Sequence, residues 1–231
     1  MNELLTLLSK YNFTRLGHKL GDPIIINCVP GAGKSTLIRE LLDTNDCFVA
    51  YSTVKADPPN LTGRKIEKLP ANIPSGKLVI LDEYQNLSAI PSGIFAAFGD
   101  PLQASCSLNL EAAFIATKTH RFGKRTCNLL KLLNFTVHSD KDDEVVIESL
   151  FGGALEGTVI CFEEEVVKLL RRHSVKFLLP CEFQGDTFEV VTFVSSGVVE
   201  GGNRSKHLVC LTRHSRKLKV LCPNAIYPRL P

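Results

Sequence analysis

At residues 23–36 the chain reads "PIIINCVPGAGKST", an apolar run that changes abruptly into glycine and small residues. Three consecutive isoleucines favour a buried β-strand. Gly31 and Gly33 allow backbone conformations that other residues avoid, so we expect a tight loop after the strand. The residues that follow, "STLIRELL", space their apolar side chains as a helix does. A strand, a glycine loop and a helix in this order indicate an α/β fold with a parallel sheet.

Apolar segments that alternate with turns or helices continue along the rest of the chain. They predict strands at "CFVAYST", "KLVILDEY" and "GIFAAFGDP" in the first half. In the second half they predict strands at "GTVICF", "VKFLLP", "TFEVVTFV", "HLVCLTR" and "KLKVLC", and a helix at "EEVVKLLRRH". We therefore divide the chain into a short N-terminal helical segment at 1–20, a first domain at 21–125 and a second domain at 126–231.

The composition is ordinary for a soluble globular protein, with 44% hydrophobic and 22% charged residues, so there is enough apolar material for a core. No run of about 18 apolar residues occurs, and we expect no direct membrane span. The N-terminus lacks the order of charge, apolar stretch and small residues that is typical of a signal peptide. Eight cysteines without a C-x-x-C pair then indicate reduced thiols in a cytosol, with neither disulfides nor zinc.

The net charge of +3 is too small to indicate a nucleic-acid partner by itself, but its distribution along the chain is uneven. Residues 201–231 hold seven Lys or Arg and no Asp or Glu, whereas residues 139–165 are rich in acids. The basic end is compatible with contacts to a phosphate backbone and equally with a solvated basic surface. Charge alone leaves both interpretations open.

The glycine loop matches the phosphate-binding pattern G-x-x-x-x-G-K-[ST] at its last three fixed positions, while Cys28 stands where the first glycine is expected. In such a loop, backbone N–H groups and the helix N-terminus hold phosphate, Lys34 reaches the β- and γ-phosphates, and Ser35 binds Mg²⁺. The alternative is a glycine turn that binds nothing. Under the first interpretation the nucleotide-binding residues are Val29, Pro30, Gly31, Ala32, Gly33, Lys34, Ser35 and Thr36.

Two later strand ends carry side chains that phosphoryl transfer needs. The apolar run of "LVILDEY" ends in Asp82, which we expect to hold Mg²⁺, and Glu83, which we expect to polarise the attacking water. "FGDPLQ" then supplies Gln103, which we expect to contact the γ-phosphate and sense its loss. A small-molecule kinase has little use for this third element, whereas a motor driven by hydrolysis needs one.

The ordered series "VPGAGKST", "LVILDEYQ", "FGDPLQA", "THRFG", "FQGDTFEVV" and "HLVCLTRH" resembles the motif set of superfamily-1 RNA helicases of positive-strand RNA viruses. The match covers nearly the whole chain. With its opening "LLTLLSKYNFTRL" and the segment "DPPNLTGRKI", the short chain is similar to the first triple-gene-block movement proteins of potex-like plant viruses.

This resemblance implies a P-loop NTPase with the superfamily-1 helicase core, built from two RecA-like domains with parallel sheets and using ATP and Mg²⁺. It implies that Lys34, Glu83 and Gln103 act in catalysis. Arg121 in "HRFG" and Arg213 in "LTRH" would join them by neutralising charge on the γ-phosphate, the alternative being a surface or RNA-phosphate arginine. We expect Arg213 to end a buried strand that holds it firmly. The residues expected to bind RNA are Thr53, Arg64, Gln184 and Thr187.

By the same resemblance the protein moves viral RNA between plant cells through plasmodesmata and suppresses host RNA silencing. The implied partners are single-stranded viral RNA, further copies of the chain, the viral coat protein, the other two triple-gene-block proteins and host silencing factors. The implied location is the host cytoplasm, with plasmodesmata. A second interpretation is an RNA-binding, self-associating interaction protein whose ATPase activity is weak or dispensable, which Cys28 and the lack of room for an extra helicase subdomain favour.

Overall fold

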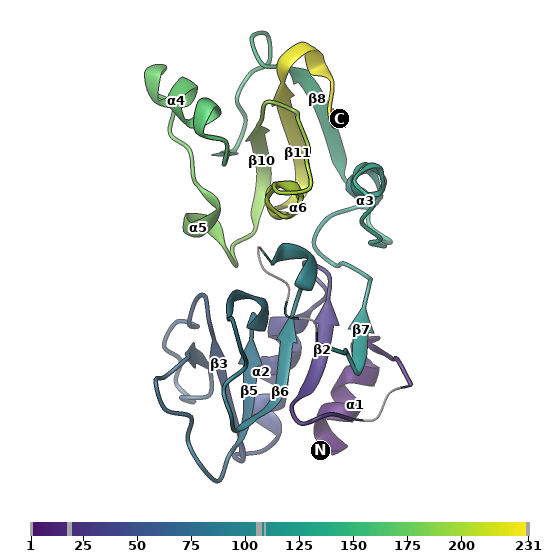
Figure 1. The fold of residues 1–231 in the computed structure, drawn as a ribbon, viewed down its shortest axis with the longest axis vertical. Helices are drawn as coiled ribbons and strands as arrows, with labels where there is room; N and C mark the ends of the chain where they lie inside the picture. The colour runs from purple at the N-terminus through teal and green to yellow at the C-terminus, as the bar shows by residue number, and fades with distance from the viewer. Residues whose placement is uncertain (1, 18–19, 105–107, 109, 230–231) are drawn as a thin grey trace. The chain divides into compact units, whose positions relative to one another are not determined.

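The computed structural model describes residues 2–17, 20–104, 108 and 110–229. The chain divides into two units, Met1–Thr117 and Lys118–Pro231, each with its own β-sheet (Figure 1). The division precedes helix α3 (Lys124–Leu132), so the whole of that helix belongs to the second unit. Cys106 lies outside the described residues, and the other seven cysteines are free thiols.

The first unit contains a seven-stranded sheet in the order β1-β7-β2-β6-β5-β3-β4, antiparallel only at its β1 edge. Ile26 and Ile80 in the central strands are fully buried because both faces of a parallel sheet are covered, one of them by α2 (Figure 1). The elements are α1 (Asn2–Lys10), β1 (Thr14–Arg15), β2 (Ile24–Cys28), α2 (Lys34–Thr44), β3 (Phe48–Ser52), β4 (Ile66–Lys68), β5 (Leu78–Asp82), η1 (Tyr84–Asn86), β6 (Ile94–Gly99), η2 (Pro101–Gln103) and β7 (Phe114–Ala116).

The second unit is built on a four-stranded, fully parallel sheet in the order β8-β11-β10-β9. Its α4 helix packs Val166, Val167 and Leu170 against Val159 and Leu221 of the sheet. After α3, the elements are β8 (Glu144–Ser149), β9 (Thr158–Ile160), α4 (Glu164–Arg172), α5 (Pro180–Phe183), β10 (Phe188–Val194), α6 (Arg204–Leu211), β11 (His214–Cys222) and η3 (Pro223–Ala225).

The predicted α/β class with parallel sheets is confirmed, but two predicted strands are wrong. "HLVCLTR" forms most of helix α6, whose buried residues are His207, Leu208, Cys210 and Leu211. A four-residue apolar run is too short for its periodicity to separate a buried strand from a buried helix turn. "VKFLLP" is not a strand either, since it contributes only the isolated bridge between Leu178 and Ile160.

The N-terminal segment is helical over α1 and then turns into the short strand β1, while residues 18–19 lie outside the described part of the chain. Leu4, Leu7 and Leu8 bury one face of α1. The Tyr11 hydroxyl donates to Glu40 of α2 over 2.8 Å, which ties the end of this segment to the helix that follows the glycine loop. No helix within the described residues is both long and apolar enough to cross a lipid bilayer.

Candidate functional site

The glycine loop of the first unit joins the end of β2 to the start of α2. Gly31 and Gly33 have φ angles of 76° and 91°, in the left-handed region where a Cβ atom is disfavoured. Gly33 caps α2 without a side chain, so none of its own atoms covers the first backbone N–H groups of the helix. The loop therefore presents the start of α2 as a place where an anion can bind.

Cys28 belongs to the sheet and not to the bend of this loop. It pairs with Ala116 of β7, and its φ angle lies outside the left-handed region. The side chain is 4% exposed, and burial raises the pKa of the thiol far above its usual value. The first position of the phosphate-binding pattern thus needs no glycine here, because the chain is still an extended strand.

Three charged side chains meet beside the loop. Lys34 Nζ contacts the Asp82 carboxylate at the end of β5 and donates to Glu83 Oε1 over 2.5 Å. The side chains of Lys34, Asp82 and Glu83 are 12%, 8% and 21% exposed, so they are largely buried yet accessible. Burial disfavours the ammonium ion, but both carboxylates outweigh it and raise the pKa of Lys34. Burial also raises the pKa of Asp82 against the opposing charge of Lys34.

A chain of hydrogen bonds leads from Glu83 to the predicted sensor Gln103. Gln85 Nε2 donates to Glu83 Oε2 over 2.5 Å, and Gln85 Oε1 accepts the backbone N–H of Asp100 over 3.1 Å. Gln103 Nε2 completes the chain by donating to Asp100 Oδ2 over 2.7 Å. Burial raises the pKa of Asp100 to about 6. The chain therefore joins the end of β6 to the end of β5.

Gln85 is a residue of this site that the sequence reading missed. It is 5% exposed, and a Cβ atom at Gly99 would lie 2.5 Å from its Oε1, so only glycine leaves room for the amide. The sequence did contain one signal for this residue. Gln85 follows Glu83 by two positions, and the turn of η1 brings its amide within reach of the Glu83 carboxylate.

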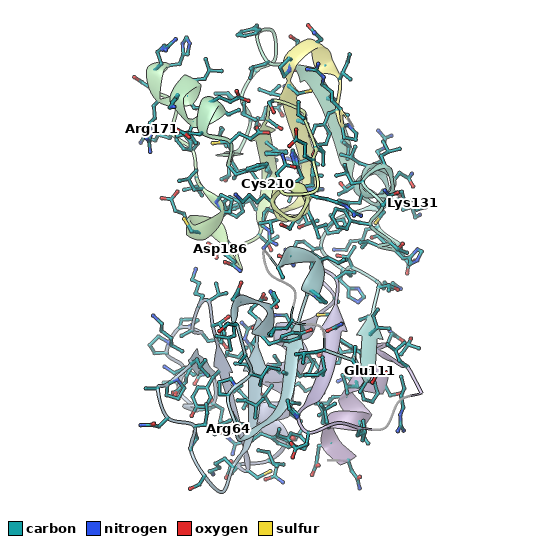
Figure 2. All side chains as sticks on the ribbon, in the orientation of Figure 1. Arg64, Glu111, Lys131, Arg171, Asp186 and Cys210 are labelled. Carbon is teal, nitrogen blue, oxygen red and sulfur yellow. The ribbon has the colours of Figure 1, made fainter. Side chains whose placement is uncertain are left out.

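The four predicted RNA contacts fall in three different places. Thr53 lies beside the site, where its Oγ1 donates to the Glu83 carbonyl over 2.8 Å. Arg64, labelled in Figure 2, instead donates to the Asp43 carbonyl over 3.1 Å and pairs with Asp46 at the C-terminal end of α2. Since α2 has 11 residues, its two ends are about 16 Å apart. The structure therefore does not bring Arg64 to the glycine loop.

Gln184 and Thr187 lie in the second unit, between α5 and β10, in the segment marked by Asp186 in Figure 2. Gln184 is the C-terminal cap of α5, and Gly185 after it has a φ angle of 87°. The segment ends where strand β10 begins, at Phe188, and the last four residues of that strand are buried.

Of the two predicted arginines, both in the second unit, Arg121 is hydrogen-bonded to the residue that precedes Arg213. Arg121 Nη1 donates to the Thr212 carbonyl over 3.1 Å, one residue before Arg213. Arg213 is 3% exposed, and its Nε donates to the Val209 carbonyl over 2.9 Å. The expectation that Arg213 ends a strand is wrong, because it stands in the turn between α6 and β11. It is held by the last turn of a helix.

Several basic side chains of the C-terminal end have partners inside the second unit. Arg204 donates to the Leu133 and Asn134 carbonyls at the end of α3, over 2.7 Å each. Arg216 pairs with Glu189 over 2.6 Å. Lys217 and Lys219 pair with three glutamates from the acid-rich stretch, which are Glu144, Glu148 and Glu156. Lys217 and Lys219 therefore connect the basic end to the acid-rich stretch through ion pairs within the second unit.

Comparison with known proteins finds relatives that match this chain over most of its length. A family described as the viral superfamily 1 RNA helicase core domain matches residues 24–222. The movement and silencing protein TGBp1 of Poplar mosaic virus is 47% identical over 232 residues, covering 98% of this chain and 99% of that protein. The protein of the same name from Lily symptomless virus is 44% identical, with the same coverage, and that of Potato virus X (strain HB) is 33% identical over 87% of this chain.

Solved structures show the same fold at much lower sequence identity. An arterivirus nonstructural protein 10 helicase, solved with DNA, aligns with a TM-score of 0.65 at 18% identity over 86% of this chain. The chain spans 60% of that helicase. The PRRSV helicase aligns with a TM-score of 0.63 over 95% of this chain. These likenesses support a helicase-type α/β fold.

Proposed function

Because this chain belongs to the TGBp1 family of movement and silencing proteins, with a viral superfamily 1 RNA helicase core, we propose that an RNA-binding, ATP-hydrolysing motor drives its movement role. The observation that carries the proposal is the contact of Lys34 with both Asp82 and Glu83 beside the glycine loop. A lysine at the start of a helix, facing two carboxylates at a strand end, is the arrangement that a magnesium nucleotide needs.

The residues around the loop fit ATP and Mg²⁺. The left-handed backbone at Gly31 and Gly33 suits a loop whose N–H groups face phosphate, and Lys34 adds a cation. Ser35 and Asp82 would hold the magnesium ion. The bound nucleotide supplies a phosphoanhydride bond and the metal neutralises its charge. Glu83 is then the carboxylate that orients water, since Gln85 and Thr53 fix its side chain and its carbonyl.

Each unit would be one RecA-like domain, with Arg121 and Arg213 as the arginines that stabilise charge on the transferring phosphoryl group. Their mutual link through the Thr212 carbonyl supports a shared role. Arginines in this role contribute about 10³- to 10⁵-fold in rate.

RNA would act on the same machinery through Thr53, whose hydroxyl holds the backbone of Glu83. An RNA strand in contact with Thr53 would shift the Glu83 carboxylate or hold it in place. This is a direct physical route by which RNA would stimulate hydrolysis. Gln184 and Thr187 would add contacts from the second unit, and Arg64 would reach RNA only along the far end of α2.

The biological role that follows is the transport of single-stranded viral RNA through plasmodesmata from the host cytoplasm, together with suppression of silencing. Coat protein, the other triple-gene-block proteins, host silencing factors and further copies of the chain are the partners proposed for that role. The TGBp1 relatives support movement and silencing by their names.

The test is ATP hydrolysis by the full chain, with and without single-stranded RNA. We expect RNA to stimulate hydrolysis, and Lys34→Ala to reduce it by at least about 10²-fold because the variant loses charge stabilisation in a partly buried site. Lys77→Ala is the matched control, since Lys77 binds the Asp46 carbonyl at the opposite end of α2. Unchanged turnover in Lys34→Ala would refute the nucleotide site. Intact RNA binding without hydrolysis in the wild type would favour the interaction protein.

A further inference from the structure

A cluster of buried polar side chains in the second unit joins His214, the last residue of the motif "HLVCLTRH", to Thr126 and Asp143, which lie outside the helicase motifs. Asp143 Oδ2 accepts the hydroxyl of Thr126 over 2.6 Å and lies 3.1 Å from His214 Nε2. Thr126 Oγ1 is also 3.0 Å from His214 Nε2. The side chains of Asp143 and His214 are both 0% exposed, so neither can touch RNA, nucleotide or solvent. Their role must be exerted through the residues they hold.

Asp143 first fixes the start of α3. Its Oδ1 accepts the backbone N–H of Arg125 over 2.9 Å and that of Thr126 over 3.4 Å, which satisfies donors that a helix start leaves open. A Cβ atom at Gly123 would lie 2.5 Å from the Asp143 backbone nitrogen, so glycine is what lets the acidic loop approach the helix. The loop and the helix start therefore form one rigid piece.

The same cluster fixes the backbone on both sides of the two arginines. His214 follows Arg213 directly, and its ring lies 6.0 Å from the ring of Phe122, which follows Arg121. Phe122 is fully buried. Arg121 in turn donates to the Thr212 carbonyl. Each arginine is thus one residue away from an aromatic or imidazole ring that packs in this cluster.

The charge state of the cluster suits a permanent brace. Burial disfavours the carboxylate of Asp143, but hydrogen bonds from His214, Thr126 and the Gly123 backbone outweigh it and lower the pKa of Asp143 to about 2. Among the described residues, His214 Nδ1 has no hydrogen-bond partner. The Nε2 side of the ring is therefore the one that joins the cluster, through Asp143 and Thr126.

We propose that Asp143, acting through His214 and Thr126, is a positioning residue for Arg121 and Arg213. This inference rests on the proposed function, in which those arginines stabilise the transferring phosphoryl group. A displaced arginine loses most of its effect, because a misplacement of about 1 Å in an active site costs on the order of 10²-fold in rate. Loss of the brace should therefore slow the chemical step and leave nucleotide binding by the first unit intact.

The experiment is a double-mutant cycle on the full chain, measuring kcat and KM for RNA-stimulated ATP hydrolysis. We expect Asp143→Asn to lower kcat by about 10- to 10²-fold with little change in KM. In the Arg213→Ala background, Asp143→Asn should cost less than it does in the wild type, since the part of its effect that passes through Arg213 is already lost and only the part through Arg121 remains. Asp142→Asn is the matched control. It removes the same charge one residue away, from a side chain that is 93% exposed.

The outcomes separate this inference from the proposed function. If Arg213→Ala leaves kcat unchanged, the role of the arginines fails and the positioning role fails with it. If Arg213→Ala slows hydrolysis but Asp143→Asn does not, or if the two losses multiply in the double variant, only the positioning role is overturned. Thr126→Val, which keeps the shape and removes the hydroxyl bound to Asp143, repeats the cycle if Asp143→Asn does not fold.

Discussion

Each unit gathers charged side chains at the start of a helix, but the two helix starts are used in opposite ways. In the first unit Gly33 leaves the N-terminus of α2 without a side-chain cap, and the facing Lys34 and Glu83 side chains are 12% and 21% exposed. In the second unit Asp143 accepts the N–H groups at the start of α3 and is completely buried. An open helix start can take an anion from outside, whereas one filled by the chain's own carboxylate serves as a brace.

This contrast teaches that buried charge does not by itself mark a binding site. Both clusters contain a carboxylate beside a nitrogen base, and both have pKa values far from the ordinary range. Access separates them, because only the cluster of the first unit can exchange its internal partner for a ligand. The second cluster can affect chemistry only by fixing Arg121 and Arg213.

The buried cluster of Thr126, Asp143 and His214 is called the closed cluster below. The largest expected effect concerns Arg213, which this cluster would hold in place. Arg213→Ala should lower the rate of hydrolysis of bound ATP by about 10³-fold or more and leave ATP binding nearly intact. Single-turnover hydrolysis together with nucleotide titration measures both quantities. Arg216→Ala is the control, since Arg216 is a nearby exposed arginine that pairs with Glu189. Loss of ATP binding with normal turnover of bound ATP would contradict the role given to Arg213.

A smaller effect should appear in acid and test the closed cluster as a brace. The folded pKa of Asp143, about 2, lies below the value of about 3.9 for an unfolded chain, so its ionised form stabilises the fold above the unfolded value. That contribution, on the order of 2 kcal/mol, is lost as the pH falls from about 4 through about 2. Urea unfolding of the wild type and Asp143→Asn at several pH values measures it.

The advantage of the wild type over Asp143→Asn should be constant above about pH 5 and shrink below about pH 4. His214 is the titratable side chain hydrogen-bonded to Asp143 within the described residues, and it is present in both proteins. Asp142→Asn, altered at an exposed carboxylate, should follow the wild type throughout. A difference independent of pH would mean that Asp143 stabilises the unit by its shape and not by its charge.

The open site was predictable from sequence because its parts are local. Gly33 to Ser35 and Asp82 to Glu83 are short runs at strand ends, and parallel strands bring such ends to one edge of the sheet. The closed cluster was not predictable, because Thr126, Asp143 and His214 come from three distant segments without a common spacing. Strand β8 was missed for a related reason.

No strand was predicted in the acid-rich stretch that contains β8, and its Glu144 and Glu148 pair with Lys217 and Lys219 of the neighbouring strand β11. The same pairs explain why the basic C-terminal end had no clear meaning in the sequence. Long-range charge compensation leaves two charge-biased segments in the chain, and neither segment shows which partner neutralises it. The helix α6 was missed because its apolar run is much shorter than the window of about 11 to 18 residues over which periodicity identifies a helix.

The smallest expected effect concerns Cys28, the fixed position at which the glycine loop departs from the phosphate-binding pattern. Cys28→Gly restores the missing glycine, but Cys28 is an extended residue of β2 paired with Ala116, and its buried side chain fills space in the sheet. Glycine there should lower the free energy of unfolding by about 1–2 kcal/mol, through greater backbone freedom in the unfolded chain and lost apolar burial.

Hydrolysis by Cys28→Gly should equal that of the wild type, because Gly31 and Gly33 already supply the left-handed backbone of the loop. Urea unfolding and ATP turnover on the same preparation check the two halves of this prediction, with Cys47→Gly as a control at a cysteine outside the loop. A several-fold gain in turnover would show that Cys28 strains the loop. The open site would then owe its shape to the strand before it as well as to its glycines.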